Sequence, residues 1–476
     1  MTPEELIEKI KKIQILKCET NTLELKSADG GCPERLYDTL SSFSNQDDGG
    51  TIVFGINEKQ GYKEVGVYDA QDLQKKITEQ CQQMSPKVRP LITVAECDGK
   101  VFVSAEIPGI DLSERPCFYS GSGRLKGSFI RVGDADEHMN EYEIYSYEAY
   151  RKKYQDDVRT ISRIDFSMLD QNSLSKYINE VKIGKPNISS MSTETIYTLM
   201  SILRNNEVTL SAAMVFCVYP QAYFPQLCIT AIVVPGTEIG DTGESGERFL
   251  DNQRIEGDIF SMLEGAISFI KRNMHVSTII DPITGKREDR TDYPITAIRE
   301  AVLNALVHRD YSIHTEGMPI QIVMYTDRIE IINPGGLYGR LTIDQLGKIQ
   351  PDTRNPVLVS TLETLHITEN RYSGIPTIRK EMEKYNLPSP EFMDQRGTFL
   401  VRMRKKQKSL DLKETDKALV EFCKIPRTRE EVVQFFHLSS ATYTIQRYVQ
   451  PLIDAGYIKL KLPDKPSSKK QRYYSD

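Results

Sequence analysis

The segment Ile298–Tyr311 constrains the fold of this chain more than any other stretch. Its polar residues Glu300, Asn304 and His308 are four residues apart, and a helix places residues at that spacing on one face. The apolar residues between them would then pack in a core. A helix with an ordinary solvated stripe fits the same pattern, so the interpretation depends on the segments that follow.

Two of the following segments contain glycines. A strand pattern over residues 320–332 ends in Asn333, with Gly335 and Gly336 just beyond it. Farther along, Ser373 and Gly374 precede an expected helix over residues 377–385. The free N–H groups and the dipole at a helix N-terminus attract phosphate. The pattern therefore predicts a phosphate-binding loop before this helix.

Taken together, these segments resemble the N-box, the adenine-binding box and the second glycine box of GHKL ATPases. The Thr353–Pro356 string also matches, and the resemblance spans roughly residues 190–403, most closely 293–400. It implies that Asn304 holds Mg²⁺ on the phosphates, that Glu300 orients the attacking water, and that Asn333 contacts the adenine. It assigns the rest of the nucleotide site to His308, Gly335, Gly336, Ser373 and Gly374.

Two departures from the GHKL pattern bear on activity. Asn333 stands where the family has Asp, and its amide accepts a hydrogen bond without charge. The second glycine box has one Gly where two are common, and Tyr372 fills a position that is often small. We therefore expect ATP and Mg²⁺ to bind, with hydrolysis weak at most.

The N-terminal 120 residues contain a second set of motifs. Glu19–Lys26, Ser41–Asn45, Gly49–Ile56 and Lys126–Gly133 follow one another in the order found in the AlbA-like domain of Schlafen proteins. The resemblance implies an α/β domain that binds nucleic acid. We place the contact at Arg124, Lys126 and Arg131, around the loop at residues 120–123, although a solvated surface loop is the simpler alternative.

Some Schlafen relatives are RNases with clustered carboxylates, and Glu19 and Glu24 match two of them. The third position is Asn57, a weaker metal ligand, and Glu58 would point to the opposite face of a strand. Nuclease activity is therefore an alternative, not the main expectation. Instead, we expect at least one of the two carboxylates to form a salt bridge or a hydrogen bond within the fold.

The C-terminal residues 404–476 hold 16 Lys and Arg against 9 Asp and Glu, whereas the whole chain has a net charge of −6. Three expected helices, a Gly456 turn and two strands follow the plan of a winged helix-turn-helix. A winged helix that contacts protein is the alternative to one that binds DNA. The expected nucleic-acid contacts are Thr442, Tyr443, Gln446, Arg447, Lys469 and Lys470.

Composition narrows the class of protein. The 8 cysteines form no ligand pattern, which favours reduced thiols, and no apolar run reaches the ~20 residues that span a bilayer. We therefore expect a soluble cytoplasmic protein that does not contact a membrane. The expected domains are residues 1–150 (Schlafen/AlbA-like), 151–290 (a middle α/β region), 291–403 (GHKL-type) and 404–476 (winged helix).

These expectations define an α+β multidomain protein: an AlbA/Schlafen-like α/β domain, a GHKL-like α/β sandwich and a C-terminal winged helix-turn-helix. The function that they favour is a nucleic-acid-binding regulator or defence-type protein, with DNA favoured, which binds ATP and forms homo-oligomers. The alternatives are a metal-dependent nuclease or weak ATPase, and an oligomeric scaffold.

Overall fold

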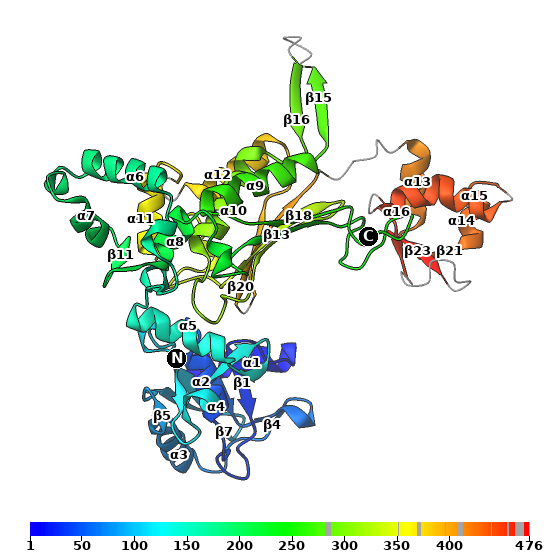
Figure 1. Ribbon diagram of the computed structural model, residues 1–476. Helices are drawn as coiled ribbons and strands as arrows, with labels where there is room; N and C mark the ends of the chain where they lie inside the picture. Colours follow the sequence, from blue (N-terminus) through cyan, green and yellow to red (C-terminus); the bar gives the residue numbers. More distant parts are fainter. Residues whose placement is uncertain are drawn as a thin grey trace.

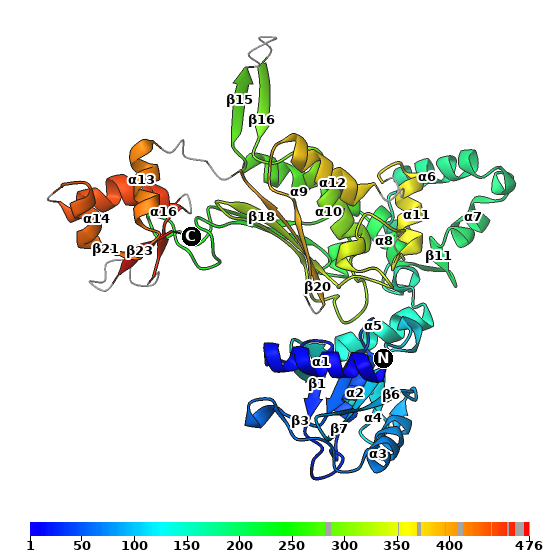
Figure 2. The same cartoon turned by 180° about the vertical axis from the view of Figure 1, so that it is seen from behind.

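The computed structural model describes residues 1–280, 287–350, 352–368, 373–395, 397–406, 413–438, 440–454, 457–461 and 471–475. The predicted contacts Lys469 and Lys470, the Gly456 turn and Tyr372 lie outside these residues. Figures 1 and 2 show an N-terminal α/β part, a central part with a long sheet, and a small C-terminal part that is set apart from both.

The N-terminal part has three layers, with a sheet in the order β1-β2-β7-β6 at its centre. Helix α1 (Pro3–Leu16) packs on one face of the sheet, and α2 (Tyr37–Ser44) and α3 (Ala70–Gln82) pack on the other. Because helices cover both faces, residues 51–54 are all buried. The sheet strands are β1 (Leu23–Lys26), β2 (Gly50–Phe54), β6 (Leu91–Cys97) and β7 (Lys100–Ile107).

Shorter elements complete this part. They are β3 (Ile56–Asn57), β4 (Lys63–Glu64), β5 (Met84–Ser85), β8 (Phe118–Tyr119), α4 (Gly123–Gly127), β9 (Phe129–Val132) and β10 (Ala135–His138). Helix α5 (Glu141–Lys152) then leads to the central part, and both views place it between the two (Figures 1 and 2).

The central part is built on a six-stranded sheet in the order β14-β13-β17-β18-β20-β19. Helices α9 (Ile259–Arg272), α10 (Ile295–His308) and α12 (Gly374–Lys384) lie along one face of it (Figure 1). The strands are β13 (Ile229–Val233), β14 (Asp251–Ile255), β17 (Ile320–Met324), β18 (Arg328–Pro334), β19 (Glu391–Gln395) and β20 (Thr398–Arg404).

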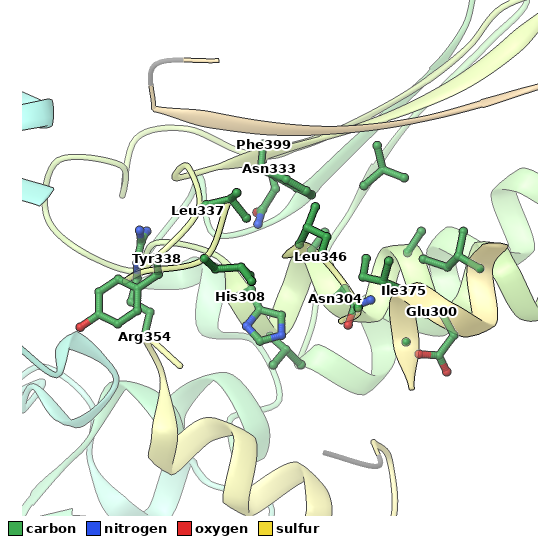
Figure 3. Close-up of a pocket in the computed structure, with 18 of the residues that line it drawn as sticks. Glu300, Asn304, His308, Asn333, Leu337, Tyr338, Leu346, Arg354, Ile375 and Phe399 are labelled. Atoms are coloured by element: carbon green, nitrogen blue, oxygen red, sulfur yellow. The ribbon is translucent and has the colours of Figure 1, made fainter. Parts of the chain in front are cut away.

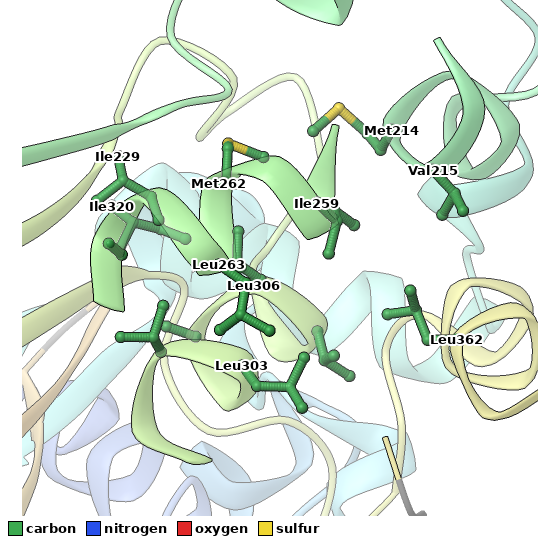
Figure 4. Packing of buried hydrophobic residues seen from close by; sticks show 14 of the residues in the cluster. Met214, Val215, Ile229, Ile259, Met262, Leu263, Leu303, Leu306, Ile320 and Leu362 are labelled. Atoms are coloured by element: carbon green, nitrogen blue, oxygen red, sulfur yellow. The ribbon is translucent and has the colours of Figure 1, made fainter. Parts of the chain in front are cut away.

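A single hydrophobic core joins this sheet to the segment that precedes it. The core runs from Ile161 to Met403, and Figure 4 labels Met214, Leu263, Leu306 and Leu362 among its buried residues. The boundary expected at residue 290 therefore does not interrupt the core. The other elements of this region are α6 (Gln171–Gly184), α7 (Thr193–Leu199), β11 (Leu203–Arg204), β12 (Glu207–Val208), α8 (Leu210–Phe216) and α11 (Pro356–Thr364).

Two local predictions from the sequence need correction: a strand around Val215 and a helix over residues 254–272. Val215, predicted in a strand, lies in α8, where every residue is buried and the Thr209 side chain caps the N-terminus. Arg254, predicted to begin a helix, lies in β14, since Gly257 at φ +112° separates that strand from α9. The hairpin β15 (Val276–Ile280) and β16 (Arg287–Thr291), which projects from the body in Figure 1, was not predicted.

The C-terminal part has its own small core around Leu419, Val432 and Val449. Its helices are α13 (Glu414–Phe422), α14 (Arg429–Phe435) and α15 (Ala441–Thr444), the last continuing through a π-helical turn (Ile445–Val449) into α16 (Gln450–Asp454). Its sheet has the order β21-β23-β22, with β21 (Arg427–Thr428), β22 (Lys459–Leu460) and β23 (Arg472–Tyr474). Across the described residues, no helix is both long and apolar enough to cross a membrane.

Candidate functional site

A cavity of about 170 Å³ opens between α10, α12, the end of β18 and the segment that follows β18. Figure 3 shows Glu300 and Asn304 at one end of it, Tyr338 and Arg354 at the other, and Asn333 and His308 between them. The cavity therefore brings together residues from three segments that the sequence separates.

One wall of the cavity is the polar face of α10. Glu300, Asn304 and His308 all line the cavity, so the predicted common face exists and borders a hollow, with His308 at a part of it that is open to solvent. Desolvation and the positive charge of Arg354 lower the pKa of His308 to about 4. The imidazole is therefore neutral at pH 7 and can meet a ligand as a flat ring or a hydrogen-bonding group.

Asn333 lies at the end of β18, where the strand runs into the glycines. It is 5 % exposed, and its Oδ1 is buried with no hydrogen-bond partner among the described residues, although it borders the cavity. An unpaired buried acceptor costs roughly 1–3 kcal/mol, and buried polar groups in native proteins are nearly always paired. The amide is therefore a group that a bound ligand would satisfy.

The N-terminus of α12 approaches α10 closely, and Gly374 makes this approach possible. A Cβ on Gly374 would lie 2.9 Å from Asn304 Nδ2 and 3.2 Å from Glu300 Oε2. The helix N-terminus, with Ser373 as its N-cap residue, is thus held beside the two polar residues of α10. A positive helix end next to an amide and a carboxylate suits a phosphate with its metal ion.

The two glycines after Asn333 are also needed for close contacts. Gly335 adopts φ +99°, and a Cβ there would come within 2.5 Å of Arg354 Nη1 and 2.6 Å of Asp310 Cβ. Gly336 faces Asp394 in the same way, at 2.6 Å from Oδ1. These glycines let the loop pack against a buried ion pair behind the cavity.

That ion pair joins the cavity to α5. Arg354 Nη1 lies 3.0 Å from Asp310 Oδ2, with side-chain exposures of 8 % and 4 %. The Tyr142 hydroxyl, on α5, donates to the same Asp310 oxygen at 2.7 Å. The sequence did not point to Tyr142, because nothing in its surroundings on the chain marks a partner 168 residues away.

The remaining residues of the His-Arg-Asp-Tyr string are structural. Arg309 is buried and donates to the Thr315 carbonyl at 3.0 Å. The Tyr311 hydroxyl donates to the Leu306 carbonyl at 2.9 Å. Only His308 of the four lines the cavity.

In the N-terminal part, Glu24 is held by two cations. Arg131 Nη2 lies 2.8 Å from Glu24 Oε2, Lys26 pairs with the other oxygen, and Arg131 Nη1 lies 2.9 Å from Asp136. The Glu19 Oε1 accepts the Leu25 N–H at 2.7 Å. The prediction that these carboxylates bond within the fold is confirmed. Among the described residues, no group of three or more His, Cys, Asp and Glu is placed to hold a metal ion.

The same geometry corrects the expectation for Arg131. Its side chain is only 1 % exposed and both ends of its guanidinium meet carboxylates, so it cannot reach a phosphate backbone in this conformation. Of the other two predicted cations, Arg124 is half-buried at 3.5 Å from Glu148, and Lys126 is exposed.

Glu19 gives a test based on pH. Partial burial and, to a lesser extent, the charge of Glu24 raise its pKa to about 7. The folded state therefore binds a proton more tightly than the unfolded state, so stability should fall as pH rises from about 4.5 to 7 and then level off. Glu19→Gln, whose amide oxygen can still accept the Leu25 N–H, should flatten this dependence in thermal unfolding between pH 4.5 and 8. An unchanged pH profile in the variant would show that Glu19 is not the titrating group.

On the C-terminal part, the four predicted contacts lie on the solvent side of the third helix. Thr442, Tyr443, Gln446 and Arg447 are exposed, while Ile445, Val449 and Leu452 form the buried side, as predicted. The exposed side chains thus share one face of a helix that is anchored by its other face.

The fold and the site define a multidomain α/β protein in which an ATPase-like sheet-and-helix layer with a polar cavity is joined to a three-layer α/β domain. Comparison with protein families gives the particular types. Residues 19–140 match the family model "Schlafen, AlbA_2", and residues 317–403 match "Putative ATP-dependent DNA helicase recG C-terminal". The chain therefore carries a Schlafen AlbA_2 domain and a RecG-related ATPase-like domain.

A third family model, "Filamentation induced by cAMP protein Fic-like, C-terminal domain", matches residues 417–474. The match of the ATPase-like domain begins after α10, so it does not include Glu300, Asn304 or His308.

Two solved structures are similar to parts of the chain. The DIP2311 protein from Corynebacterium diphtheriae is 14 % identical with a TM-score of 0.41, over 93 % of this chain and 92 % of that one. The N-terminal domain of a putative ATP-dependent DNA helicase RecG-related protein from Nitrosomonas europaea is 22 % identical with a TM-score of 0.24, over 29 % of this chain and 92 % of that one. No curated protein sequence matches significantly.

Proposed function

We propose that this chain is a nucleic-acid-binding regulator whose binding of DNA responds to ATP and Mg²⁺. The observation that carries the nucleotide half of the proposal is the buried, unpartnered Oδ1 of Asn333 at the cavity. An adenine amino group would donate to that oxygen. The nearby His308 is neutral at pH 7, which is compatible with an uncharged base beside it.

The phosphates would lie at the other end of the cavity. Asn304 offers an amide oxygen to Mg²⁺, the N-terminus of α12 offers backbone N–H groups to the phosphates, and Glu300 stands one turn from Asn304. Mg²⁺ in such sites keeps several waters and takes few protein ligands, so a single amide with substrate phosphates is sufficient. Turnover would depend on Glu300 as the base for water.

We place the link between nucleotide and nucleic acid at α5. Tyr142 contacts the Asp310–Arg354 pair, and the Tyr150 hydroxyl donates to Asp352 at 3.3 Å. Arg354 and Asp352 both line the cavity, so α5 contacts the cavity wall. The AlbA_2 domain directly precedes α5 in the sequence. A ligand that shifts this wall would shift α5 and the N-terminal domain with it.

We assign duplex DNA to the C-terminal part, as a winged helix. Helix α13 is followed by strand β21, by two further helices and then by strands β22 and β23, and β21 pairs with β23 at one edge of the sheet. This is the order of elements in winged helix-turn-helix domains. The exposed residues Thr442, Tyr443, Gln446 and Arg447 would face the major groove. Lys126 of the AlbA_2 domain offers a further exposed cation. Homo-oligomerisation stays a prediction, which sedimentation can test.

The duplex assignment predicts a strong salt dependence. Each phosphate contact adds a slope of about −0.9 to log affinity against log salt concentration. Removing residues 410–476 should abolish most specific binding, and Arg447→Glu in the full chain should weaken binding and reduce the slope by about 0.9. Fluorescence anisotropy over a salt series measures both. Lys185→Glu, at an exposed site just after the C-terminus of α6, is the matched control. If the truncated protein binds the same sites equally well, the C-terminal part is not the reader.

A further inference from the structure

A second cavity lies on the outer side of Tyr338, between α5 with its following turn and the loop after β18. Its volume is about 550 Å³, and it shares Tyr338, Asp352 and Arg354 with the cavity that contains Asn333. We refer to this second cavity as the interdomain groove. Neither family match describes a site between the two domains.

Several cationic side chains line the interdomain groove. Arg151, Lys153 and Arg340 lie on its solvent side, whereas Arg354 is already paired with the buried Asp310, and the carboxylate in the lining is Asp352. The three solvent-side cations are the groups that an anion would contact in the groove.

The charges that face solvent are available to a ligand. Lys153 is exposed and forms no ion pair with any residue that the structure describes. Arg340 lies 3.3 Å from Asp111, with exposures of 66 % and 50 %, and Arg151 lies 3.9 Å from Glu148. Exposed pairs of this kind contribute little stability, so a phosphate can replace the carboxylate at small cost.

Aromatic rings accompany these cations. Tyr150, Tyr154 and Tyr338 line the groove, with Tyr154 40 % exposed and the Tyr150 and Tyr338 centroids 5.6 Å apart. Cations that follow a phosphate backbone and rings on which bases stack are the two components of single-strand nucleic-acid sites.

From this combination we infer that the interdomain groove binds single-stranded nucleic acid, with phosphates at Lys153 and Arg340 and a base stacked on Tyr154. Stacking accepts any base, so the site has little sequence preference. The inference rests on the proposed function only in that the ligand is a nucleic acid. It requires neither ATP binding nor a duplex reader in the C-terminal part.

The test uses the full chain and a labelled deoxythymidine oligomer of about 12 nucleotides, measured by anisotropy over a salt series. The double variant K153E/R340E should bind at least about tenfold more weakly, and its salt slope should fall by about 1.4, which is two contacts at about 0.7 each. The control K185E/K271E makes the same charge change at two exposed positions, one just after the C-terminus of α6 and one on α9, and should stay within about twofold of wild type.

Two further arms separate the alternatives. Tyr154→Ala should weaken oligomer binding about tenfold and Tyr154→Phe should restore it, because the ring and not the hydroxyl stacks. Free thymidine monophosphate at the same nucleotide concentration should not displace the oligomer. Displacement would show that the groove binds a mononucleotide and not a single strand, and would overturn the inference.

The inference is also wrong if K153E/R340E and the control K185E/K271E bind the oligomer with equal affinity. A duplex of the same length should bind K153E/R340E within about twofold of wild type. If wild type binds the oligomer but no duplex, the proposal that the C-terminal part binds duplex DNA fails, whereas the inference that the interdomain groove binds a single strand is supported.

Discussion

Replacing Asn304 by Ala is expected to weaken the binding of Mg²⁺–ATP by about 100-fold, or roughly 2.8 kcal/mol at 1.4 kcal/mol per factor of ten. Asn304 is the amide that lines the cavity beside the N-terminus of α12, where the phosphates and their metal ion would lie. Loss of groups that only support a metal ligand already costs 10–100-fold, so loss of a direct ligand belongs at the upper end. Titration calorimetry with ATP in Mg²⁺ and in EDTA measures the effect.

The expected pattern is specific to metal. In EDTA, wild type and Asn304→Ala should bind ATP alike, because the missing interaction passes through Mg²⁺. Thr296→Ala, at an exposed position on the same helix, should behave as wild type in both conditions. If Asn304→Ala binds ATP in Mg²⁺ with the affinity of wild type, Asn304 is not a ligand of the metal ion.

The second large effect concerns stability. Asp310→Ala should lower the free energy of unfolding by about 3–5 kcal/mol, since it leaves the buried Arg354 guanidinium without its carboxylate. Tyr142→Phe removes one hydrogen bond to the same carboxylate and should cost only about 1 kcal/mol. Urea unfolding measures both, and the transition that involves the central part is the one compared, because a multidomain chain need not unfold in one step.

The two variants should differ in a second respect. Tyr142→Phe should weaken the influence of ATP on nucleic-acid binding while ATP affinity changes little, because it cuts the contact between α5 and the cavity wall. Similar losses of stability in Asp310→Ala and Tyr142→Phe would mean that Arg354 is not held by Asp310 as the structure shows.

Much of the cavity that contains Asn333 could be predicted from the sequence, because its parts are local. The spacing of Glu300, Asn304 and His308 predicts that they share one helix face. The glycines beside Asn333 and after Ser373 indicate places where the backbone closely approaches other groups. Each is readable within one short segment. The order of the segments matched a known family, so their meeting in space followed from resemblance and not from spacing.

What could not be predicted depends on contacts between distant segments. Arg131 has the sequence context of a surface cation, yet Glu24 lies 107 residues away and draws it into the interior. Tyr142 and Asp310 pair over 168 residues. Polar contacts of this kind leave no periodicity in the sequence, whereas burial of apolar faces does.

The errors in secondary structure have a similar origin. The run in α8 is apolar except for Ser211 and is buried on every side, so its pattern does not distinguish helix from strand. Arg254 and its neighbours form a strand because β13 pairs with them, and that pairing is tertiary.

The most direct test of the proposed function is a linked titration of ATP and duplex DNA in Mg²⁺. If the cavity and the DNA-binding surfaces are coupled through α5, saturating Mg²⁺–ATP must change DNA affinity, and saturating DNA must change ATP affinity by the same factor. We expect a factor of about 5 or more in both directions, abolished by Asn304→Ala. If DNA affinity is the same within error with and without Mg²⁺–ATP, or if no adenine nucleotide binds the folded chain, the account of a nucleotide-responsive regulator is wrong.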